Sequence, residues 1–443
     1  MPKLILIYPA MGRRPGKKFV RSWQQEPLAM GILAALTPEN WEVVFFDDRV
    51  EKIDYNQSAD LVGISLETYT AKRGYQIAEK FRSKKIPVIF GGYHATLCPE
   101  EALEHADAIC LGEAEGIWGN ILNDVVAGKL QMRYKAASPC DLKDLKIRRD
   151  IFKGKNYMPL SLIETSRGCP MKCSFCSIAA FYKSTYRQRP PEDVVREIRE
   201  ARHKYIFFVD DNFAGNKEGT KELCRAVKPL GCKWITQCGI SGLKDPELVR
   251  LMAESGCLGL LIGFESLNPA NLRAMNKSAN KAEEYTEVLE NLRNNGIFVY
   301  GTFMFGYPDD TPDSFDSSVS FAMREKMFIA AFNHLVAFPG TPLYRELKEN
   351  GELLSEHWWL DDDFYFGQSP VKPQRMTSRE LELNCLQARR RFFSIGAILK
   401  RAIDFRCNCS SFKNLWRYLS VNALLHREIS SKRGIPLGVR DET

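Results

Sequence analysis

The chain has 443 residues, of which 44% are apolar and 26% are charged, a composition typical of a water-soluble protein large enough for two or three domains. No run approaches the roughly 18 consecutive apolar residues of a spanning helix, and the short apolar start predicts a buried strand instead of a signal peptide. The odd count of 13 cysteines argues against a disulfide framework, so we expect a cytoplasmic protein.

Residues 1–135 alternate short β-rich runs with helical stretches, which predicts a doubly wound, Rossmann-like α/β domain. The predicted strands are residues 4–9, 41–46, 61–65, 87–90 and 108–111. Ligands bind beyond the carboxyl ends of such strands, where glycines let a flat or phosphorylated ligand approach the backbone. The turns there contain Ser65, Leu66, Thr68, Gly91, Gly92, Tyr93, His94, Thr96, Gly112, Glu113 and Glu115. No G-x-G-x-x-G follows the first strand, so a dinucleotide is disfavoured.

After a charged, proline-containing linker over residues 136–160, a second β/α series occupies residues 161–350. Its predicted strands are residues 161–165, 205–209, 233–237, 258–264, 298–305 and 330–338. Six such units imply an open (β/α)6 barrel, whose active site lies at the carboxyl ends of the strands. Polar side chains follow these ends, namely Asp210, Asp211, Asn212, Gln237, Glu265 and Ser266.

Three cysteines, Cys169, Cys173 and Cys176, follow the first strand of this series. A cubane [4Fe–4S] cluster normally takes four Cys ligands, so three would leave one iron open to a small molecule. A structural zinc site wants four Cys or His ligands, usually in two separated pairs, and no His lies within twenty residues of the motif. The spacing therefore favours a [4Fe–4S] cluster with an open, catalytic iron.

The C-terminal region, residues 351–443, is expected to be mainly helical from Ser378. The aromatic-rich stretch at residues 357–373 either covers the barrel mouth and contacts an apolar substrate, or packs the domains together. From Arg389 onward the chain carries 12 Lys or Arg against 4 Asp or Glu, interleaved with Phe392, Phe393, Phe405, Phe412, Trp416 and Tyr418. This mixture suits an anionic membrane surface or a phosphate-bearing ligand, and no nucleic-acid module accompanies it. The alternative is a pair of amphipathic helices with solvated basic faces.

The cysteine motif, with Phe175 just before its third cysteine, resembles the signature of the radical S-adenosylmethionine (SAM) superfamily. In that family SAM chelates the open iron, and one electron from the cluster splits SAM to a 5′-deoxyadenosyl radical. Residues 263–266 and 210–212 resemble the motifs on strands four and two of that barrel. The resemblance implies a flavodoxin- or ferredoxin-type electron donor and SAM-binding roles for Phe175, Asp211, Asn212, Gln237, Glu265 and Ser266.

The region ahead of this motif resembles the cobalamin-binding domain of cobalamin-dependent radical SAM enzymes, through the turns at residues 91–96 and 112–115. The resemblance makes the eleven turn residues named above the expected cobalamin site. One departure is that none of the six histidines has an Asp two residues before it, so the D-x-H-x-x-G motif that ligates cobalt in other cobalamin proteins is absent. We expect a cobalt without a protein His ligand, with His94 contacting the nucleotide tail; the alternative is a degenerate pocket.

From end to end the chain resembles the subgroup of hopanoid C-2 methylases and anaerobic magnesium-protoporphyrin ester cyclases, whose substrates are large, apolar and ring-rich. This implies methyl transfer to an unactivated carbon, in which the radical abstracts hydrogen and the substrate radical takes a methyl group from methylcobalamin. The alternatives are a cyclase or oxidase in which cobalamin donates no methyl, and a non-catalytic cobalamin or cluster sensor. The basic tail makes peripheral contact with the inner face of the membrane a further expectation, and neither the substrate nor a catalytic residue is identified.

Overall fold

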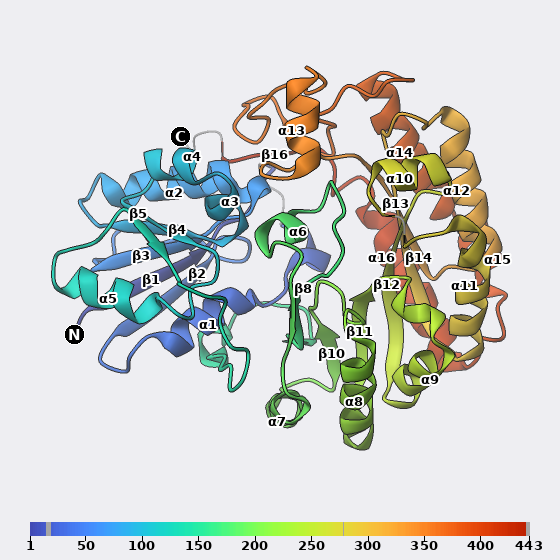
Figure 1. The fold of residues 1–443 in the computed structure, drawn as a ribbon, viewed down its shortest axis with the longest axis horizontal. Helices are drawn as coiled ribbons and strands as arrows, with labels where there is room; N and C mark the ends of the chain where they lie inside the picture. The colour runs from blue at the N-terminus through green and yellow to red at the C-terminus, as the bar shows by residue number, and fades with distance from the viewer. Residues whose placement is uncertain (15–18, 278, 440–443) are drawn as a thin grey trace.

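The computed structural model describes residues 1–14, 19–277 and 279–439, which contain two large parallel sheets (Figure 1). The first sheet has the strand order β2-β1-β3-β4-β5-β6. Its strands are β1 Lys3–Tyr8, β2 Glu42–Asp47, β3 Leu61–Ser65, β4 Val88–Gly91, β5 Ala108–Leu111 and β6 Arg133–Lys135. The five strands expected in this region are confirmed, and β6 is an additional edge strand that the sequence did not indicate.

Helices cover both faces of this sheet, as a doubly wound fold requires. They are α1 Leu28–Leu36, α2 Ala71–Arg82, α3 Gly92–Leu97, α4 Pro99–Glu104 and α5 Trp118–Val126. Leu4 and Leu6 of β1 lie in a core shared with α1 and α5, whereas Ile5 and Ile7 lie in the core shared with α2. Residues 91–96 were expected to form a turn, but α3 already begins at Gly92, directly after β4. Gly92 has a φ of 90°, which lets the chain pass from the strand into the helix without a longer turn.

The second sheet has the order β14-β13-β12-β11-β10-β7, with β14 and β7 at its two edges, so the barrel is open. The strands are β7 Ser161–Ile163, β10 Tyr205–Phe208, β11 Lys233–Cys238, β12 Cys257–Glu265, β13 Phe298–Phe305 and β14 Ile329–His334. The helices between them are α7 Pro191–Glu200, α8 Lys217–Val227, α9 Pro246–Glu254, α10 Pro269–Ala274, α11 Tyr285–Asn294 and α12 Pro312–Arg324. The predicted (β/α)6 barrel is confirmed.

The two faces of the barrel sheet differ in what covers them. Phe264 of β12 packs on Tyr285 of α11. Other buried side chains of β12 and β13 lie in the same core, so helices cover this outer face of the sheet. On the opposite, inner face Leu261 lies beside Tyr300 in the parallel register, and both side chains are half-buried. The inner face therefore remains partly accessible.

A short antiparallel pair, β8 Ser166–Gly168 and β9 Tyr186–Gln188, lies between the two sheets together with α6 Ser177–Phe181 (Figure 1). Phe181 of α6 contacts Tyr93 of α3, with ring centroids 4.6 Å apart. This segment therefore joins the barrel to the first sheet.

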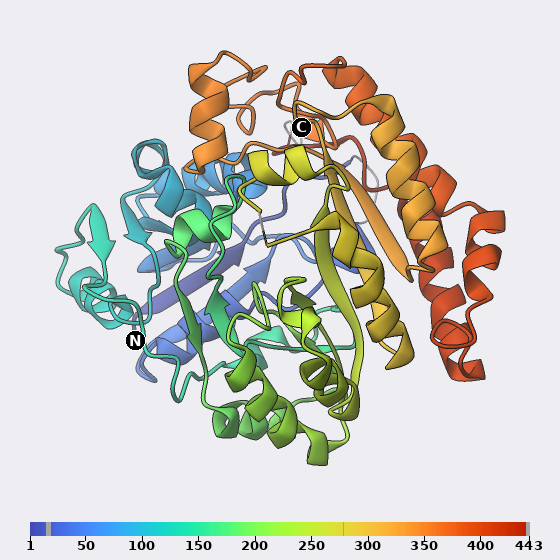
Figure 2. The ribbon, with the colours of Figure 1, turned by 45° about the vertical axis from the view of Figure 1, so that its right-hand side comes forward.

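The C-terminal region is helical, as predicted, with α13 Pro342–Glu349, α14 Ser378–Phe392, α15 Ile395–Ala402 and α16 Phe412–Glu428. In Figure 2, α15 and α16 (red) lie on the side of the barrel away from the first sheet (blue). The Arg401 guanidinium donates to the carbonyls of Met327 and Phe328, just before β14 begins. These two helices therefore pack at the amino end of the barrel strands.

The chain finally returns to the first sheet. Strand β16 Ile435–Pro436 pairs with β15 Tyr365–Phe366, and Gly438 forms a bridge with Gly12. Gln76 of α2 exchanges hydrogen bonds of 2.9 and 3.0 Å with the backbone of Val439. Within the described part of the chain, no helix combines the length and the apolar character that crossing a bilayer requires.

Candidate active site

The cysteine loop begins directly after β8. Gly168, at a φ of 81°, has no room for a Cβ, which would lie 2.2 Å from the Thr185 carbonyl oxygen, so the loop starts at a position that only glycine fits. Burial raises the pKa of the Cys173 thiol to about 11, a value to which the neighbouring Cys176 and Cys169 thiols also contribute. The three thiols lie in one short loop, and as a donor set they fit a cluster with three protein ligands.

Lys277 supplies positive charge beside this centre. Its Nζ lies 2.6 Å from Glu265 Oε1 and 5.9 Å from the centroid of the Phe175 ring. The Lys277 cation lowers the pKa of Cys173, opposing the effect of burial. Lys277 belongs to no motif, so nothing in the sequence singled it out.

The strand-two motif lies against the same loop. The Asp210 carboxylate accepts hydrogen bonds of 2.8 and 2.5 Å from the backbone of Thr165 and Ser166, and burial raises its pKa to about 7. Asp211 accepts from the Gly168 backbone at 2.9 Å, and burial raises its pKa to about 6. The Asn212 amide lies 3.6 Å from Cys169 Sγ. Asp210 therefore holds the strand end, while Asp211 and Asn212 contact the cysteine loop.

The two remaining expected SAM residues differ in position. Gln237 donates from Nε2 to the Asp211 carbonyl at 2.9 Å, which joins it to the strand-two motif. The Ser266 hydroxyl accepts from the Asn268 backbone at 3.0 Å and is buried in a local turn. The structure thus joins Gln237 to Asp211 by a direct hydrogen bond, whereas the Ser266 hydroxyl accepts a hydrogen bond within its own turn.

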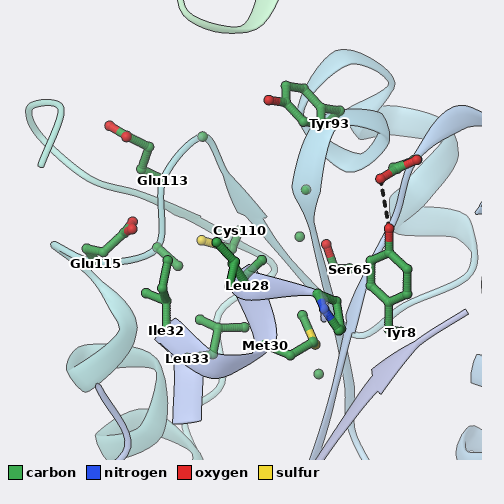
Figure 3. A pocket seen from close by; sticks show the side chains of 18 of the residues that line it. Tyr8, Leu28, Met30, Ile32, Leu33, Ser65, Tyr93, Cys110, Glu113 and Glu115 are labelled. Carbon is green, nitrogen blue, oxygen red and sulfur yellow. Dashed lines mark hydrogen bonds between the residues drawn. The ribbon is translucent and has the colours of Figure 1, made fainter. Parts of the chain in front are cut away.

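A cavity of about 460 Å³ lies where the carboxyl ends of the first sheet meet the barrel (Figure 3). Seven of the expected cobalamin residues line it: Ser65, Gly91, Gly92, Tyr93, Gly112, Glu113 and Glu115. A Cβ on Gly112 would meet no atom within 4 Å, so the strand end opens onto free space. The volume and the glycine-edged wall fit a large organic cofactor. The sequence did not indicate the apolar wall formed by α1, which contributes Leu28, Met30, Ile32 and Leu33.

Four expected residues, Leu66, Thr68, His94 and Thr96, do not line this cavity. The His94 ring is fully buried and lies 3.0 Å from Glu101 and 3.1 Å from Tyr75. One helical step separates His94 from cavity-lining Tyr93 and turns its ring toward Tyr75 of α2 and Glu101 of α4, away from the cavity. Thr96 instead accepts a 3.0 Å hydrogen bond from the Gly112 backbone, which supports the turn.

An ion-pair cluster joins the first sheet to the cysteine loop. Arg167, two residues before Cys169, lies 2.8, 2.6 and 2.9 Å from carboxylate oxygens of Glu113, Glu115 and Glu164. Arg187 lies 2.7 Å from Glu113.

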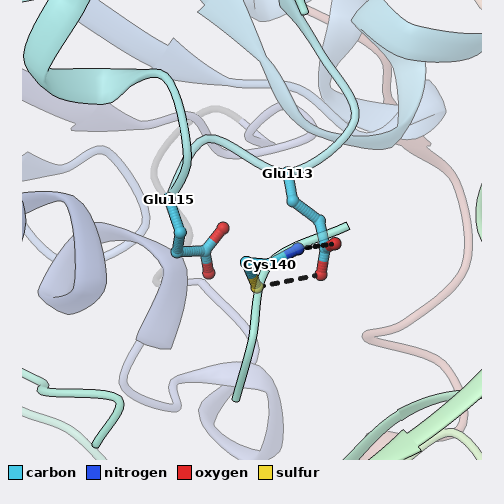
Figure 4. Close-up of side chains that lie close together, drawn as sticks. All are labelled: Glu113, Glu115 and Cys140. Carbon is cyan, nitrogen blue, oxygen red and sulfur yellow. Dashed lines mark hydrogen bonds between the residues drawn. The ribbon is translucent and has the colours of Figure 1, made fainter. Parts of the chain in front are cut away.

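Figure 4 shows Glu113 and Glu115 flanking Cys140, close enough to suggest a cation site. Burial raises the pKa of Cys140 to about 12, which keeps its thiol protonated, and Arg167 and Arg187 already neutralise the carboxylates. Through Arg167 and Arg187 the group forms an ion-pair clamp between the first sheet and the barrel.

Comparison with known proteins matches both halves of this site. Residues 163–322 match the radical SAM superfamily, and residues 24–122 match the B12 binding domain. Bacteriochlorophyllide d C-8(2)-methyltransferase of Chlorobaculum tepidum is 33% identical over 361 residues, covering 75% of this chain and 79% of that protein. Bacteriochlorophyllide d C-12(1)-methyltransferase of the same organism is 30% identical over 388 residues, covering 85% of this chain and 84% of that protein. The solved cobalamin-dependent radical enzyme OxsB, with aqua-cobalamin and SAM bound, shares the fold at a TM-score of 0.68 and 15% identity, covering 96% of this chain and 72% of OxsB.

Proposed function

Because the chain belongs to the cobalamin-dependent radical SAM family, we propose that it transfers a methyl group to an unactivated carbon of a large, apolar, tetrapyrrole-like substrate. The observation that carries the proposal is the shared wall of the two sites. Arg167 and Glu164 line the cavity at the end of the first sheet, and Arg167 also opens the segment that carries the three cysteines. A cofactor in the cavity and one on the cysteine loop would therefore meet at a single reaction space.

The enzyme uses a [4Fe–4S] cluster, SAM and cobalamin. When bound, the cluster and SAM supply a carbon-centred radical, and cobalamin supplies a transferable methyl group. We assign Cys169, Cys173 and Cys176 to the cluster. SAM would be held by Phe175, Asp211, Asn212, Gln237 and Glu265, and cobalamin by the seven cavity-lining residues named above.

The side chains of the protein bind and orient these cofactors. The Asp211 carboxylate is largely ionised at neutral pH and accepts charge-assisted hydrogen bonds from an ammonium group. The Lys277 cation balances the negative charge of the thiolates, and Glu265 fixes its position. The Arg167 clamp excludes water between the two sites, because its guanidinium is almost fully buried.

The inner face of the barrel suits an apolar substrate that carries an anion. Half-buried Leu261, Tyr300 and Met304 give it an apolar floor. At its open edge Arg389 of α14 donates to Asn333 at 2.8 Å, and no described residue forms an ion pair with it. We propose that Arg389 receives a carboxylate of the substrate.

We retain three further proposals. A flavodoxin- or ferredoxin-type protein would supply the electron, and the C-terminal region would touch the inner face of the membrane. The domains would span residues 1–135, 161–350 and 351–443, with a linker at 136–160, which the separation of the two sheets supports.

The deciding experiment is anaerobic reconstitution with methyl-labelled SAM and a panel of tetrapyrroles and hopanoid-type lipids. Labelled product means methyl transfer. Formation of 5′-deoxyadenosine with unlabelled product would favour the cyclase or oxidase, and absence of both would favour a sensor. Arg389→Met should raise KM for a free acid but not for its methyl ester, whereas Arg390→Met, exposed one residue away, should change neither.

A further inference from the structure

Exposed apolar side chains gather on the last two long helices and the segment between them. Of the thirteen large apolar residues exposed in the described part of the chain, seven lie between residues 395 and 424. We call these seven the α15–α16 apolar face: Ile395, Leu399, Ile403, Phe405, Phe412, Trp416 and Leu424. Phe412 is 84% exposed and Phe405 is 77% exposed, so solvent covers nearly the whole of both rings. Such a patch on a soluble protein marks an interaction surface.

The exposure belongs to well-anchored helices. Ile395, Leu399 and Ile403 recur every four residues and so form one stripe along α15 and its C-terminal cap. On the opposite sides of these helices, Arg401 and Tyr418 are fully buried. The expected aromatic residues of this tail thus divide into two groups, because Phe392, Phe393 and Tyr418 pack inward whereas Phe405, Phe412 and Trp416 face water.

The segment that carries this face is strongly basic, and its Arg406 pairs with exposed Glu290 of α11. Residues 394–427 contain six Lys or Arg and one acidic residue, Asp404, which is buried. Lys400 and Lys413 are exposed beside the apolar stripes, and neither forms an ion pair with any described residue. Exposed rings among unpaired cations complement an anionic lipid surface.

The position and charge of the face argue against an electron-donor protein or a second copy of this chain as its occupant. Tyr418 packs on Phe328, and Arg417 donates to the hydroxyl of Tyr205, the first residue of β10, so the face lies at the amino end of the barrel. The cysteine loop lies at the carboxyl end, so an electron donor docked here would be a full strand length from it. A second copy of this chain would bring cations against cations.

We propose that the α15–α16 apolar face docks this protein on an anionic bilayer, with Phe405, Phe412 and Trp416 entering the lipid interface. This inference does not depend on the reaction catalysed. It also places the cysteine loop and the cavity on the side away from the bilayer, so substrate enters from the aqueous side.

The test is co-sedimentation of the full chain with vesicles of phosphatidylcholine alone or mixed equally with phosphatidylglycerol. We expect binding only to the mixed vesicles, and its loss when salt rises from about 0.05 to about 0.5 M. Each basic residue near the surface contributes a factor of roughly five, so Lys400→Glu with Lys413→Glu should weaken binding at least roughly thirty-fold, because the loss of the two positive charges alone gives that factor and the two new negative charges add repulsion. Phe412→Ser with Trp416→Ser should weaken it at least about ten-fold through lost apolar burial.

The matched control is Val126→Ser with Lys129→Glu on α5 and its following turn, which also replaces an exposed apolar and an exposed basic residue. It should bind like the unchanged protein. Absence of binding to both vesicle types, or an equal loss in the control, would overturn the proposal. A concentration-dependent dimer in size-exclusion chromatography that Phe412→Ser with Trp416→Ser abolishes would assign the face to a second copy instead.

Discussion

Replacing Arg167 by methionine tests whether the ion-pair cluster clamps the two domains. The Arg167 side chain is 5% exposed and lies within 3 Å of three carboxylates, two of them from the first sheet's β5–α5 connection. Removing one partner from a buried ion pair costs about 3–5 kcal/mol, because the other charge stays buried and uncompensated. Since Arg187 still neutralises Glu113, we expect the lower end, about 3 kcal/mol of unfolding free energy.

The assay is urea unfolding under anaerobic conditions, and the control is Arg133→Met. Arg133 also pairs with a glutamate, Glu100, but both side chains are exposed to solvent, which screens the pair, so its loss should cost much less than the loss of Arg167. Adding Glu115→Gln and Glu164→Gln to Arg167→Met should recover much of the loss. If Arg167→Met is no worse than Arg133→Met, or if neutralising the carboxylates brings no recovery, the clamp does not exist.

Three further predictions follow from the sites. Replacing Cys169, Cys173 and Cys176 by alanine should abolish the charge-transfer absorption and SAM cleavage; retention of about four irons per chain would contradict the assignment. Paramagnetic resonance of bound cob(II)alamin should show no axial nitrogen splitting from a protein His, and His94→Ala should leave the spectrum unchanged. Burial lowers the pKa of His334 from 6.5 to about 3, so its contribution to stability is complete above pH 6.5 and is lost as the pH falls toward 3. Between pH 6.5 and 5 the unchanged protein, without cofactors, should lose about 2 kcal/mol more than His334→Gln; parallel stability curves would contradict the buried neutral imidazole.

The strands were predictable where an apolar run ends in glycine or a polar residue. The expected strand at residues 298–305 coincides with β13. The one expected at 330–338 is too long, because Leu335 and Ala337 are buried by packing after β14 has ended. Strand β6 was missed because charged Arg133 and Lys135 flank a single buried residue, Tyr134, and one alternation of this kind is too short to predict a strand.

The cysteine loop and the strand-end motifs were predictable because their residues are contiguous. The ion pairs that hold this loop in place were not predictable, because Arg167 and Glu113 are 54 residues apart in the sequence and come together only when the first sheet packs on the barrel. Tyr93 and His94 show the same limit at short range. Whether Tyr93 or His94 faces the cavity depends on how α3 is rotated about its axis. The glycines at the start of α3 made a turn the expected structure, so the helix itself was not predicted.

The return of the chain to the first sheet bears on how the protein is synthesised and handled. Arg14 donates to the Gly434 carbonyl across 420 residues, and Gln76 holds Val439. At elongation rates of about 5–20 residues per second, the groups around Arg14 wait roughly 20–80 s for these partners. The first domain therefore reaches its final packing only after the barrel has emerged, and residues 434–439 are a poor place to begin a purification tag or a truncation.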